Sequence, residues 1–322
     1  MIKIPINIVF LALSLTGCAK AQEPKNRDIA DAQKAVDTTM TAGTPILADT
    51  TAGSNSLGTA NDRRLVERIL RTTCKNYAAW GKEKTIVWIA RQFIGVPYVG
   101  HTLDRSDTEH MVINLHELDC TTYVEAVLAL AHCTFEGKSS FPDYCKAAQQ
   151  VRYQDGKVSY ENRLHYFQWW VADNVRKGLV QEITLPASIF TGRQLLRIDY
   201  MSTHASNYDM LRNHSERVQA IAKREKVWQG KMVSYIPKER LADTSLRQVV
   251  HDGDIIGLVT NKAGLDASHL GIAVWHKDGL YLLNASSLKK NGKQVVEPQE
   301  TLFAYLAARD HNKGIRVLRI SE

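Results

Sequence analysis

Apolar residues recur at helical spacing through the first half of the chain. Residues 61–97 carry two apolar stripes, which predict one or two helices that end where the proline of "GVPY" disfavours helical backbone. A further helix is predicted over residues 120–132. Its i, i+3, i+4, i+7 face consists of Val124, Val127, Leu128 and Ala131. This helix has two alternative starts, a capping box of Thr122 with Glu125 or an N-cap at Asp119.

The pattern changes to a strand-like period after residue 252. Short β-branched and apolar runs lie between glycine-containing turns, in "DGDIIGLVTN", "SHLGIAVW", "LYLLNASS" and "GIRVLRIS", and they predict an antiparallel meander. Residues 134–245 are harder to assign. Helices are predicted around "HYFQWWVADNVRKG" and within residues 199–226, with short strands between them. Helices first and strands last predict an α+β domain.

Composition sets the first 60 residues apart from the rest. Residues 1–18 have a positive start, an apolar stretch too short to span a bilayer, and the ending "LTGC". This ending resembles the bacterial lipobox, in which lipid is attached to the cysteine, here Cys18; an ordinary leader with a chance cysteine is the alternative. Residues 19–60 are rich in small and polar residues and predict a flexible linker. Residues 61–322 are long enough for one sizeable core.

Positive charge is spread along the chain. Its 41 Lys and Arg against 34 Asp and Glu give a formal net charge of +7, without the Lys/Arg run typical of nucleic-acid binding. We therefore expect no nucleic-acid partner, whereas a mildly basic surface suits an anionic polymer. His101, His110 and His116 lie in one segment, but their spacing matches no familiar metal site, so we expect neither a metal nor a cofactor.

Four cysteines follow Cys18, and one of them stands at a predicted helix start. Cys74, Cys133 and Cys145 carry no motif. In an oxidising compartment the four permit two disulfides, whose pairing the sequence leaves open. Cys120 begins the predicted helix, where free N–H groups and the helix dipole favour a thiolate and stabilise an oxyanion. It is therefore the candidate nucleophile.

A nucleophilic cysteine needs a base, and His269 is the leading candidate. It begins the predicted strand "SHLGIAVW", and the small residues Gly271 and Ala273 on the same face leave that face open to a substrate. If residues 276–279 form the hairpin loop, Asn284 lies diagonally across from His269, within reach of a hydrogen bond. A two-residue Asp-Gly loop would break this arrangement.

Together these blocks resemble the NlpC/P60 superfamily of cysteine hydrolases, in its N-acetylmuramoyl-L-alanine amidase-like branch. "GVPYVG", "LDCTTYVE", "GDIIGLVTN", "SHLGIAV" and "LNASS" match its blocks over most of residues 80–320, and "NRLHYFQWWVADN" looks like a signature of that branch. The resemblance implies a papain-like α+β fold with a large insertion. In that fold the nucleophile stands at a helix N-terminus, and the helix packs on an antiparallel sheet.

The resemblance also assigns roles to residues. It implies Cys120 as nucleophile, His269 as base and Asn284 as the residue that orients the base. Many relatives have histidine at the third place; the carbonyl of Asn284 accepts a hydrogen bond there but brings no charge. Tyr98 resembles a tyrosine that contacts substrate near the oxyanion. Asp119 resembles an acid that meets a free peptide amine, with the N-cap as its alternative role.

An aromatic segment after residue 160 has two interpretations. Its members are Tyr166, Phe167, Trp169 and Trp170. They line a groove for sugar or peptide or, given their helical spacing, belong to the core. Arg163 and His165 beside them are candidate contacts for substrate carboxylates.

These features predict a lipid-anchored hydrolase on the periplasmic side of the outer membrane of a Gram-negative bacterium, where Ala19 after the lipidated cysteine favours that membrane. Its partners would be peptidoglycan or muropeptides, cleaved at the amide between N-acetylmuramic acid and L-Ala. The alternative enzyme is a peptidase that cuts the stem peptide between γ-D-Glu and diaminopimelate. The alternative from another class is a non-catalytic lipoprotein that binds the cell wall.

Overall fold

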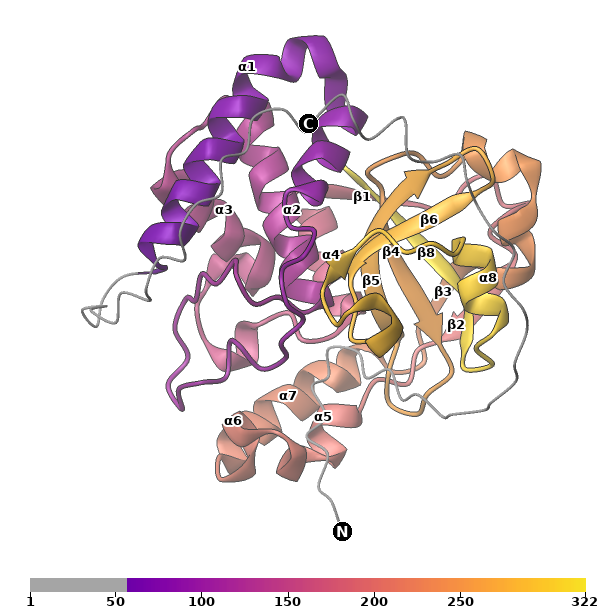
Figure 1. The fold of residues 1–322 in the computed structure, drawn as a ribbon. Helices are drawn as coiled ribbons and strands as arrows, with labels where there is room; N and C mark the ends of the chain where they lie inside the picture. Colours follow the sequence, from indigo (N-terminus) through magenta and orange to yellow (C-terminus); the bar gives the residue numbers. More distant parts are fainter. Residues whose placement is uncertain (1–56) are drawn as a thin grey trace. The chain divides into compact units, whose positions relative to one another are not determined.

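The computed structural model of the protein describes residues 57–322 (Figure 1). The predicted leader at residues 1–18, Cys18 itself and all but the last few residues of the predicted linker lie outside the described residues. Within the described part, no helix is both long and apolar enough to cross a membrane.

Helices dominate the first half of the described chain and strands dominate its end, as the periodicity predicts. The helices are α1 (Ala60–Arg91), α2 (Cys120–Phe135), α3 (Phe141–Arg152), α4 (Phe167–Arg176), α5 (Tyr200–Thr203), α6 (Asp209–Arg212), α7 (Ser215–Trp228) and α8 (Leu302–Ala307). The strands are β1 (Val180–Ile183), β2 (Gly192–Leu195), β3 (Met232–Pro237), β4 (Ile255–Thr260), β5 (Ala267–Trp275), β6 (Leu280–Ala285), β7 (Val295–Val296) and β8 (Asn312–Ile320). Two helical segments meet within α1 at Gly81, whose φ of 72° breaks the helix.

All strands belong to one antiparallel sheet. Its order is β2-β3-β8-β4-β5-β6-β7, and β1 also pairs with β8. The predicted meander is therefore confirmed over β4 to β6, whereas the last strand, β8, lies between β3 and β4. Ile272 pairs with Leu283, and Trp275 pairs with Leu280. The hairpin loop is thus residues 276–279, which is the longer of the two loops considered.

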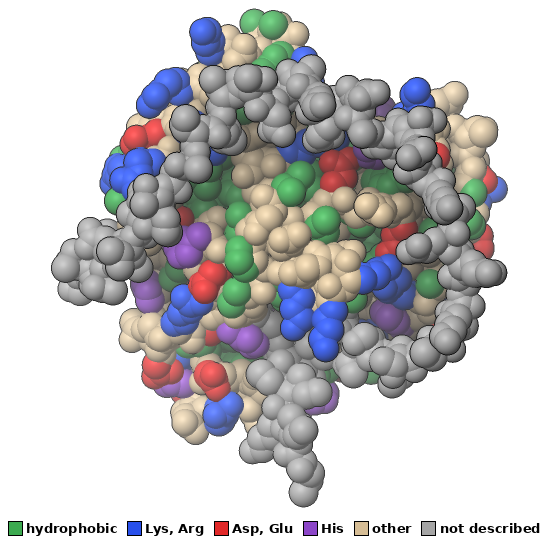
Figure 2. Space-filling model, viewed as in Figure 1, with side chains coloured by type: hydrophobic (Ala, Val, Ile, Leu, Met, Phe, Trp, Pro, Cys, Tyr) green, Lys and Arg blue, Asp and Glu red, His purple; other side chains and the backbone are tan. Residues whose placement is uncertain are grey.

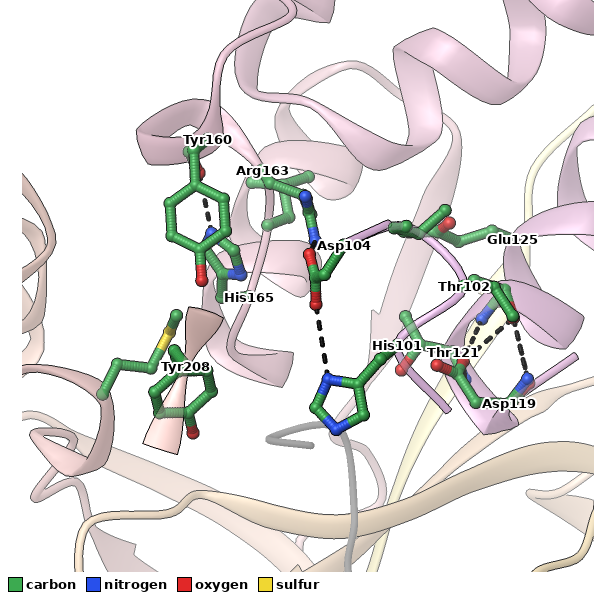
Figure 3. A pocket seen from close by; sticks show the side chains of 14 residues that line it. His101, Thr102, Asp104, Asp119, Thr121, Glu125, Tyr160, Arg163, His165 and Tyr208 are labelled. Carbon is green, nitrogen blue, oxygen red and sulfur yellow. Dashed lines mark hydrogen bonds and ion pairs between the residues drawn. The ribbon is translucent and has the colours of Figure 1, made fainter. Parts of the chain in front are cut away.

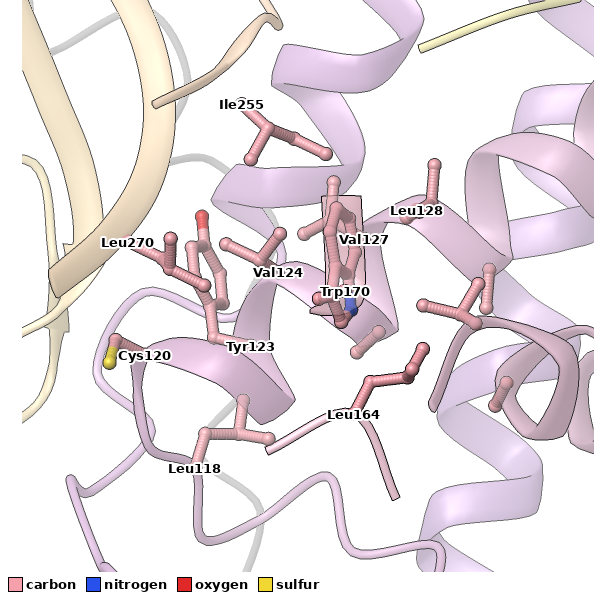
Figure 4. Packing of buried hydrophobic residues seen from close by; sticks show 14 of the residues in the cluster. Leu118, Cys120, Tyr123, Val124, Val127, Leu128, Leu164, Trp170, Ile255 and Leu270 are labelled. Carbon is pink, nitrogen blue, oxygen red and sulfur yellow. The ribbon is translucent and has the colours of Figure 1, made fainter. Parts of the chain in front are cut away.

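Helix α2 lies at the centre of the molecule. Fourteen of its sixteen residues are buried, because α1, α3 and β5 all pack against it. The sequence predicted one apolar face, but α2 is apolar almost all round, which is the pattern of an enclosed helix. Figure 4 shows Val124 and Val127 of this helix near Ile255 of β4 and Leu270 of β5. The start of α2 is therefore held against the start of β5.

The N-cap of α2 is Asp119, not Thr122. Oδ1 of Asp119 accepts hydrogen bonds from the backbone N–H groups of Thr121 and Thr122, at 3.0 and 2.8 Å. The hydroxyl of Thr122 in turn accepts from the backbone N–H of Asp119, at 2.9 Å, which completes a capping box. The alternative box with Glu125 is wrong, because Glu125 accepts instead from the Nε of buried Arg152, at 2.8 Å.

Both faces of the sheet are covered. One face packs on the central helices, through residues that include Leu270, Ile272 and Val274. The other packs on α8 and on two short helical turns at Lys238–Ala242 and Thr244–Gln248, through residues that include Ile256, Leu258 and Ala273. Figure 1 shows α8 on the side of the sheet away from α2. The expectation that one sheet face stays open is therefore wrong.

Charges of both signs are interspersed on the surface in view. Figure 2 shows Lys and Arg side chains among acidic ones on this face, without one dominant basic patch. This distribution matches the even spread of charge along the sequence.

The buried ion pair between Glu125 and Arg152 gives a prediction about stability. The two side chains are 4% and 7% exposed, so Glu125→Leu leaves a buried guanidinium without its counter-charge. We expect the free energy of unfolding to fall by about 3 kcal/mol in urea titration. The double variant Glu125→Leu/Arg152→Met should recover most of that loss, because no buried charge remains. A single variant as stable as the parent would contradict this account.

Candidate active site

Cys120 is the first residue of α2, and it is fully buried. Its sulfur meets the backbone N–H of Leu270, the residue that follows His269 on β5. Figure 4 shows the Cys120 side chain at the start of the helix, with Leu270 nearby. Two segments far apart in sequence thus bring the predicted nucleophile next to the predicted base.

His269 is oriented by Asn284 on the neighbouring strand. Its Nε2 lies 2.8 Å from Oδ1 of Asn284. The side-chain amide of Asn284 donates to the carbonyl oxygen of Leu282, at 2.7 Å, so its own oxygen must face the ring. Nε2 therefore carries the proton of the neutral ring, and Nδ1 carries the lone pair. This is the hydrogen bond that the longer hairpin loop predicts.

The surroundings of His269 keep its ring neutral. Burial lowers the pKa of His269 to about 4; the positive charge of Arg309 lowers it further, while the hydrogen bond to Asn284 opposes the shift. An imidazole with this pKa is uncharged at neutral pH. It is therefore in the form that a general base needs.

The thiol of Cys120 is not a ready-made thiolate, in contrast to the expectation from the helix N-terminus. Burial and the negative charge of Asp119 raise its pKa well above the ordinary value, although the N–H of Leu270 opposes this. The first N–H groups of α2, on Thr121 and Thr122, are occupied by the Asp119 carboxylate. Cys120 therefore needs a base to take its proton.

Tyr98 lies on the segment that runs beside the residues before Cys120. Its segment runs parallel to the residues before Cys120: Tyr98 bridges to Leu118, and the N–H of Val99 donates to the carbonyl of Leu118, at 3.1 Å. Burial raises the pKa of Tyr98, and the charges of Cys120 and Asp119 add to this. Its hydroxyl is thus protonated at neutral pH.

A pocket next to the start of α2 contains three of the predicted substrate contacts. Asp119, Arg163 and His165 all line it. Figure 3 shows them together with Tyr160, from the same segment as Arg163 and His165, and with His101, Asp104 and Tyr208, which come from other segments. The second oxygen of Asp119, Oδ2, accepts no hydrogen bond within residues 57–322, so this buried carboxylate offers an open acceptor to a substrate.

Arg163 and His165 are less suited to carboxylate binding than the sequence suggested. Arg163 donates to Asp104 at 2.6 Å and to Glu109 at 3.0 Å, so two internal carboxylates already compensate its charge. His165 pairs through Nε2 with the carbonyl of Tyr160, at 2.7 Å. Burial and the charge of Arg163 lower the pKa of His165 to about 3, which leaves it uncharged. The aromatics that follow belong to the core.

Two residues near the base, Tyr305 and Arg309, carried no signal in the sequence. His269 and Asn284 line a second, smaller hollow together with Tyr305 of α8, and Arg309 just beyond α8 stacks on the ring of Tyr305 at 3.7 Å. Nothing in the spacing relates α8 to the nucleophile. The prediction that Gly271 and Ala273 leave room for substrate is wrong: Ala273 is fully buried, and a Cβ on Gly271 would lie 2.7 Å from Leu282.

The four cysteines of the described part are free thiols. Cys74, Cys120, Cys133 and Cys145 form no disulfide with one another, which resolves the pairing that the sequence left open for the described part. Across residues 57–322 there is also no group of three or more His, Cys, Asp or Glu side chains placed to hold a metal ion.

Comparisons with known proteins show which family the chain resembles. Residues 88–315 match a family model described as AmiA-like, N-acetylmuramoyl-L-alanine amidase-like. The chain is 36% identical to an N-acetylmuramoyl-L-alanine amidase from Bacteroides uniformis, with a TM-score of 0.68, over 78% of this chain and 100% of that one.

Two other solved structures are similar. A protein from Bacteroides fragilis, described provisionally as a xylanase, is 42% identical over 72% of this chain and 99% of its own, with a TM-score of 0.67. A protein from Legionella pneumophila shares the fold at 22% identity, with a TM-score of 0.61, over 82% of this chain and 94% of its own. None of the curated proteins matches the chain. The chain belongs to the AmiA-like, N-acetylmuramoyl-L-alanine amidase-like family.

Proposed function

We propose that this protein hydrolyses the amide between N-acetylmuramic acid and L-Ala in peptidoglycan, with Cys120 as nucleophile. The observation that carries the proposal is the His269–Asn284 hydrogen bond, which orients a neutral imidazole on the strand that meets Cys120. The family of the chain supports the choice of bond. The order of helix-borne cysteine, strand histidine and polar residue on the next strand also favours the NlpC/P60 superfamily.

The proposed reaction begins with proton transfer from Cys120 to Nδ1 of His269 as the sulfur attacks the lactyl carbonyl carbon. The tetrahedral intermediate collapses when the imidazolium of His269 gives that proton to the departing amine of L-Ala. A muramoyl thioester remains on Cys120. Water then attacks the thioester, with His269 as base, and the thiol leaves with its proton restored.

Asn284 supports this cycle through orientation. Its carbonyl oxygen holds the Nε2–H of His269, so the lone pair on Nδ1 stays directed at one place. Asn284 is uncharged and therefore stabilises the transient imidazolium less than a carboxylate would. The pKa of His269 is accordingly low, because burial disfavours the imidazolium and the hydrogen bond to Asn284 only partly opposes this shift.

One observation favours the alternative of a stem-peptide peptidase. The open oxygen of Asp119 lies in the pocket next to the nucleophile, and a buried carboxylate with an unused acceptor attracts an ammonium group such as a free peptide amine. The non-catalytic alternative is weakened by the free thiol of Cys120, since a disulfide there would have blocked the nucleophile.

The products of digestion distinguish these functions. Residues 57–322 should release stem peptides that begin with L-Ala from soluble muropeptides, detected by mass spectrometry. Cys120→Ala should abolish release, because no nucleophile remains, whereas Cys133→Ala, on the same helix, should leave it unchanged. Cleavage between γ-D-Glu and diaminopimelate would transfer the function to the peptidase alternative. Intact substrate with the parent protein would refute both.

The pH dependence tests the role of His269 as base. Because protonation of His269 removes the base, kcat/KM should fall only as the pH drops through about 4, well below the usual histidine range. Arg309→Gln removes a positive charge that lowers this pKa, so the acid limb should move to higher pH.

Arg247→Gln is the matched control for this shift. Arg247 stacks on Trp275, away from the base, and its loss should leave the acid limb in place. Equal profiles for the parent and Arg309→Gln would mean that another group controls the acid limb.

A further inference from the structure

Two buried polar groups in the pocket beside Cys120 have no partner in the described part of the chain. They are Nε2 of His101 and the hydroxyl of Tyr208. Tyr208 is only 5% exposed, so its hydroxyl has lost water without gaining a protein partner. Buried polar atoms are almost always hydrogen-bonded, so each of these two groups has an unused hydrogen bond that water or a ligand can fill. Both residues line the same pocket, on the side away from Tyr160 and Arg163 (Figure 3).

His101 combines an uncommon backbone angle with a neighbouring carboxylate. Its φ of 62° is uncommon for a residue with a side chain, and such strain concentrates at functional sites. Its Nδ1 lies 3.6 Å from Oδ2 of Asp104. Although burial opposes it, His101 and Arg163 hold the pKa of Asp104 below its usual range, so this carboxylate is ionised. An anion beside Nδ1 favours the proton there, which leaves Nε2 as a hydrogen-bond acceptor.

The charges around the pocket decide what kind of ligand suits these two groups. The carboxylates of Asp104, Asp119 and Glu125 line it, while only Arg163 among its lining residues is a permanent cation. A ligand carboxylate would therefore be repelled. The hydroxyl of Tyr208 both donates and accepts, and Nε2 of His101 accepts. Uncharged groups that both donate and accept, such as a hydroxyl or an acetamido group, complement this pair.

We propose that His101 and Tyr208 bind the sugar of the muramoyl half of the substrate, through its hydroxyl or acetamido groups. This inference rests on the proposed function, in which the acyl group transferred to Cys120 is the muramoyl group. The pocket adjoins the nucleophile through Asp119 and Thr121, so a sugar attached to the reacting carbonyl reaches it. His101 and Tyr208 then determine specificity by binding the sugar and not the peptide.

A pair of substrates that differ only in the sugar tests this inference. One is N-acetylmuramoyl-L-alanyl-D-isoglutamine, and the other is D-lactoyl-L-alanyl-D-isoglutamine, which keeps the scissile amide without the sugar. Tyr208→Phe removes one hydroxyl and keeps the ring. It should lower kcat/KM for the sugar-bearing substrate about tenfold, the size of one lost hydrogen bond, and leave the lactoyl substrate unchanged. His101→Asn should have the same selective effect on kcat/KM, because asparagine tolerates the same backbone angle.

Tyr144→Phe is the matched control, because Tyr144 is a buried tyrosine of α3 outside the pocket. This variant should leave kcat/KM unchanged for both substrates. Equal losses on both substrates with Tyr208→Phe, or no loss on either, would overturn the inference while leaving the proposed function intact.

Binding separates the pocket from the chemistry. Calorimetry with Cys120→Ala should show tighter binding of the sugar-bearing compound than of the lactoyl compound, and adding Tyr208→Phe should remove that difference. If the parent protein cleaves neither compound while the binding difference persists, the proposed function fails and the sugar site stands. Equal binding of the two compounds would overturn the sugar site.

Discussion

Enclosure of α2 is the constraint on which the rest of the structure depends. A helix that is apolar almost all round cannot lie on a surface, so α1, α3 and β5 must surround it. Its capping box with Asp119 fixes where it begins. Because the helix cannot shift or rotate without exposing apolar side chains, Cys120 is held at one place, against the start of the strand that carries His269.

The same enclosure sets the chemistry of the site. Burial raises the pKa of Cys120 and lowers that of His269, so both groups are neutral at rest. The N-cap bonds of Asp119 occupy the N–H groups that would otherwise stabilise a thiolate. A neutral thiol and a neutral imidazole are compatible with a mechanism in which proton transfer accompanies attack. The burial that positions the nucleophile thus makes its reaction dependent on the base.

Local patterns in the sequence were sufficient for the parts of the site that lie within one helix or one hairpin. The helix after Cys120 follows from its apolar spacing, with its cap at Asp119 as one of two alternatives, and the His269–Asn284 hydrogen bond follows if the hairpin loop has four residues. Contacts over long separations were not accessible in this way. Arg163 meets Asp104 and Glu109, 59 and 54 residues away, and no spacing rule links them.

The pocket and the covered sheet face illustrate the same limit. Tyr208 reaches the pocket through a segment whose short helices have little periodicity, and α8 covers a strand face that the small residues were expected to leave open. Gly271 is small because Leu282 packs over it, not because a substrate needs the space. Small side chains on a strand therefore indicate close packing as readily as a site.

The most direct test of the account is the mass of the intact protein after brief exposure to a muropeptide and quenching in acid. The account predicts an adduct with the mass of the muramoyl group, located on Cys120 by peptide mapping and absent from Cys120→Ala. An adduct with the mass of the muramoyl-L-Ala-γ-D-Glu fragment on Cys120 would keep the nucleophile and contradict the proposed bond. Turnover with an adduct on another residue, or with an unchanged rate in Cys120→Ala, would contradict the nucleophile itself.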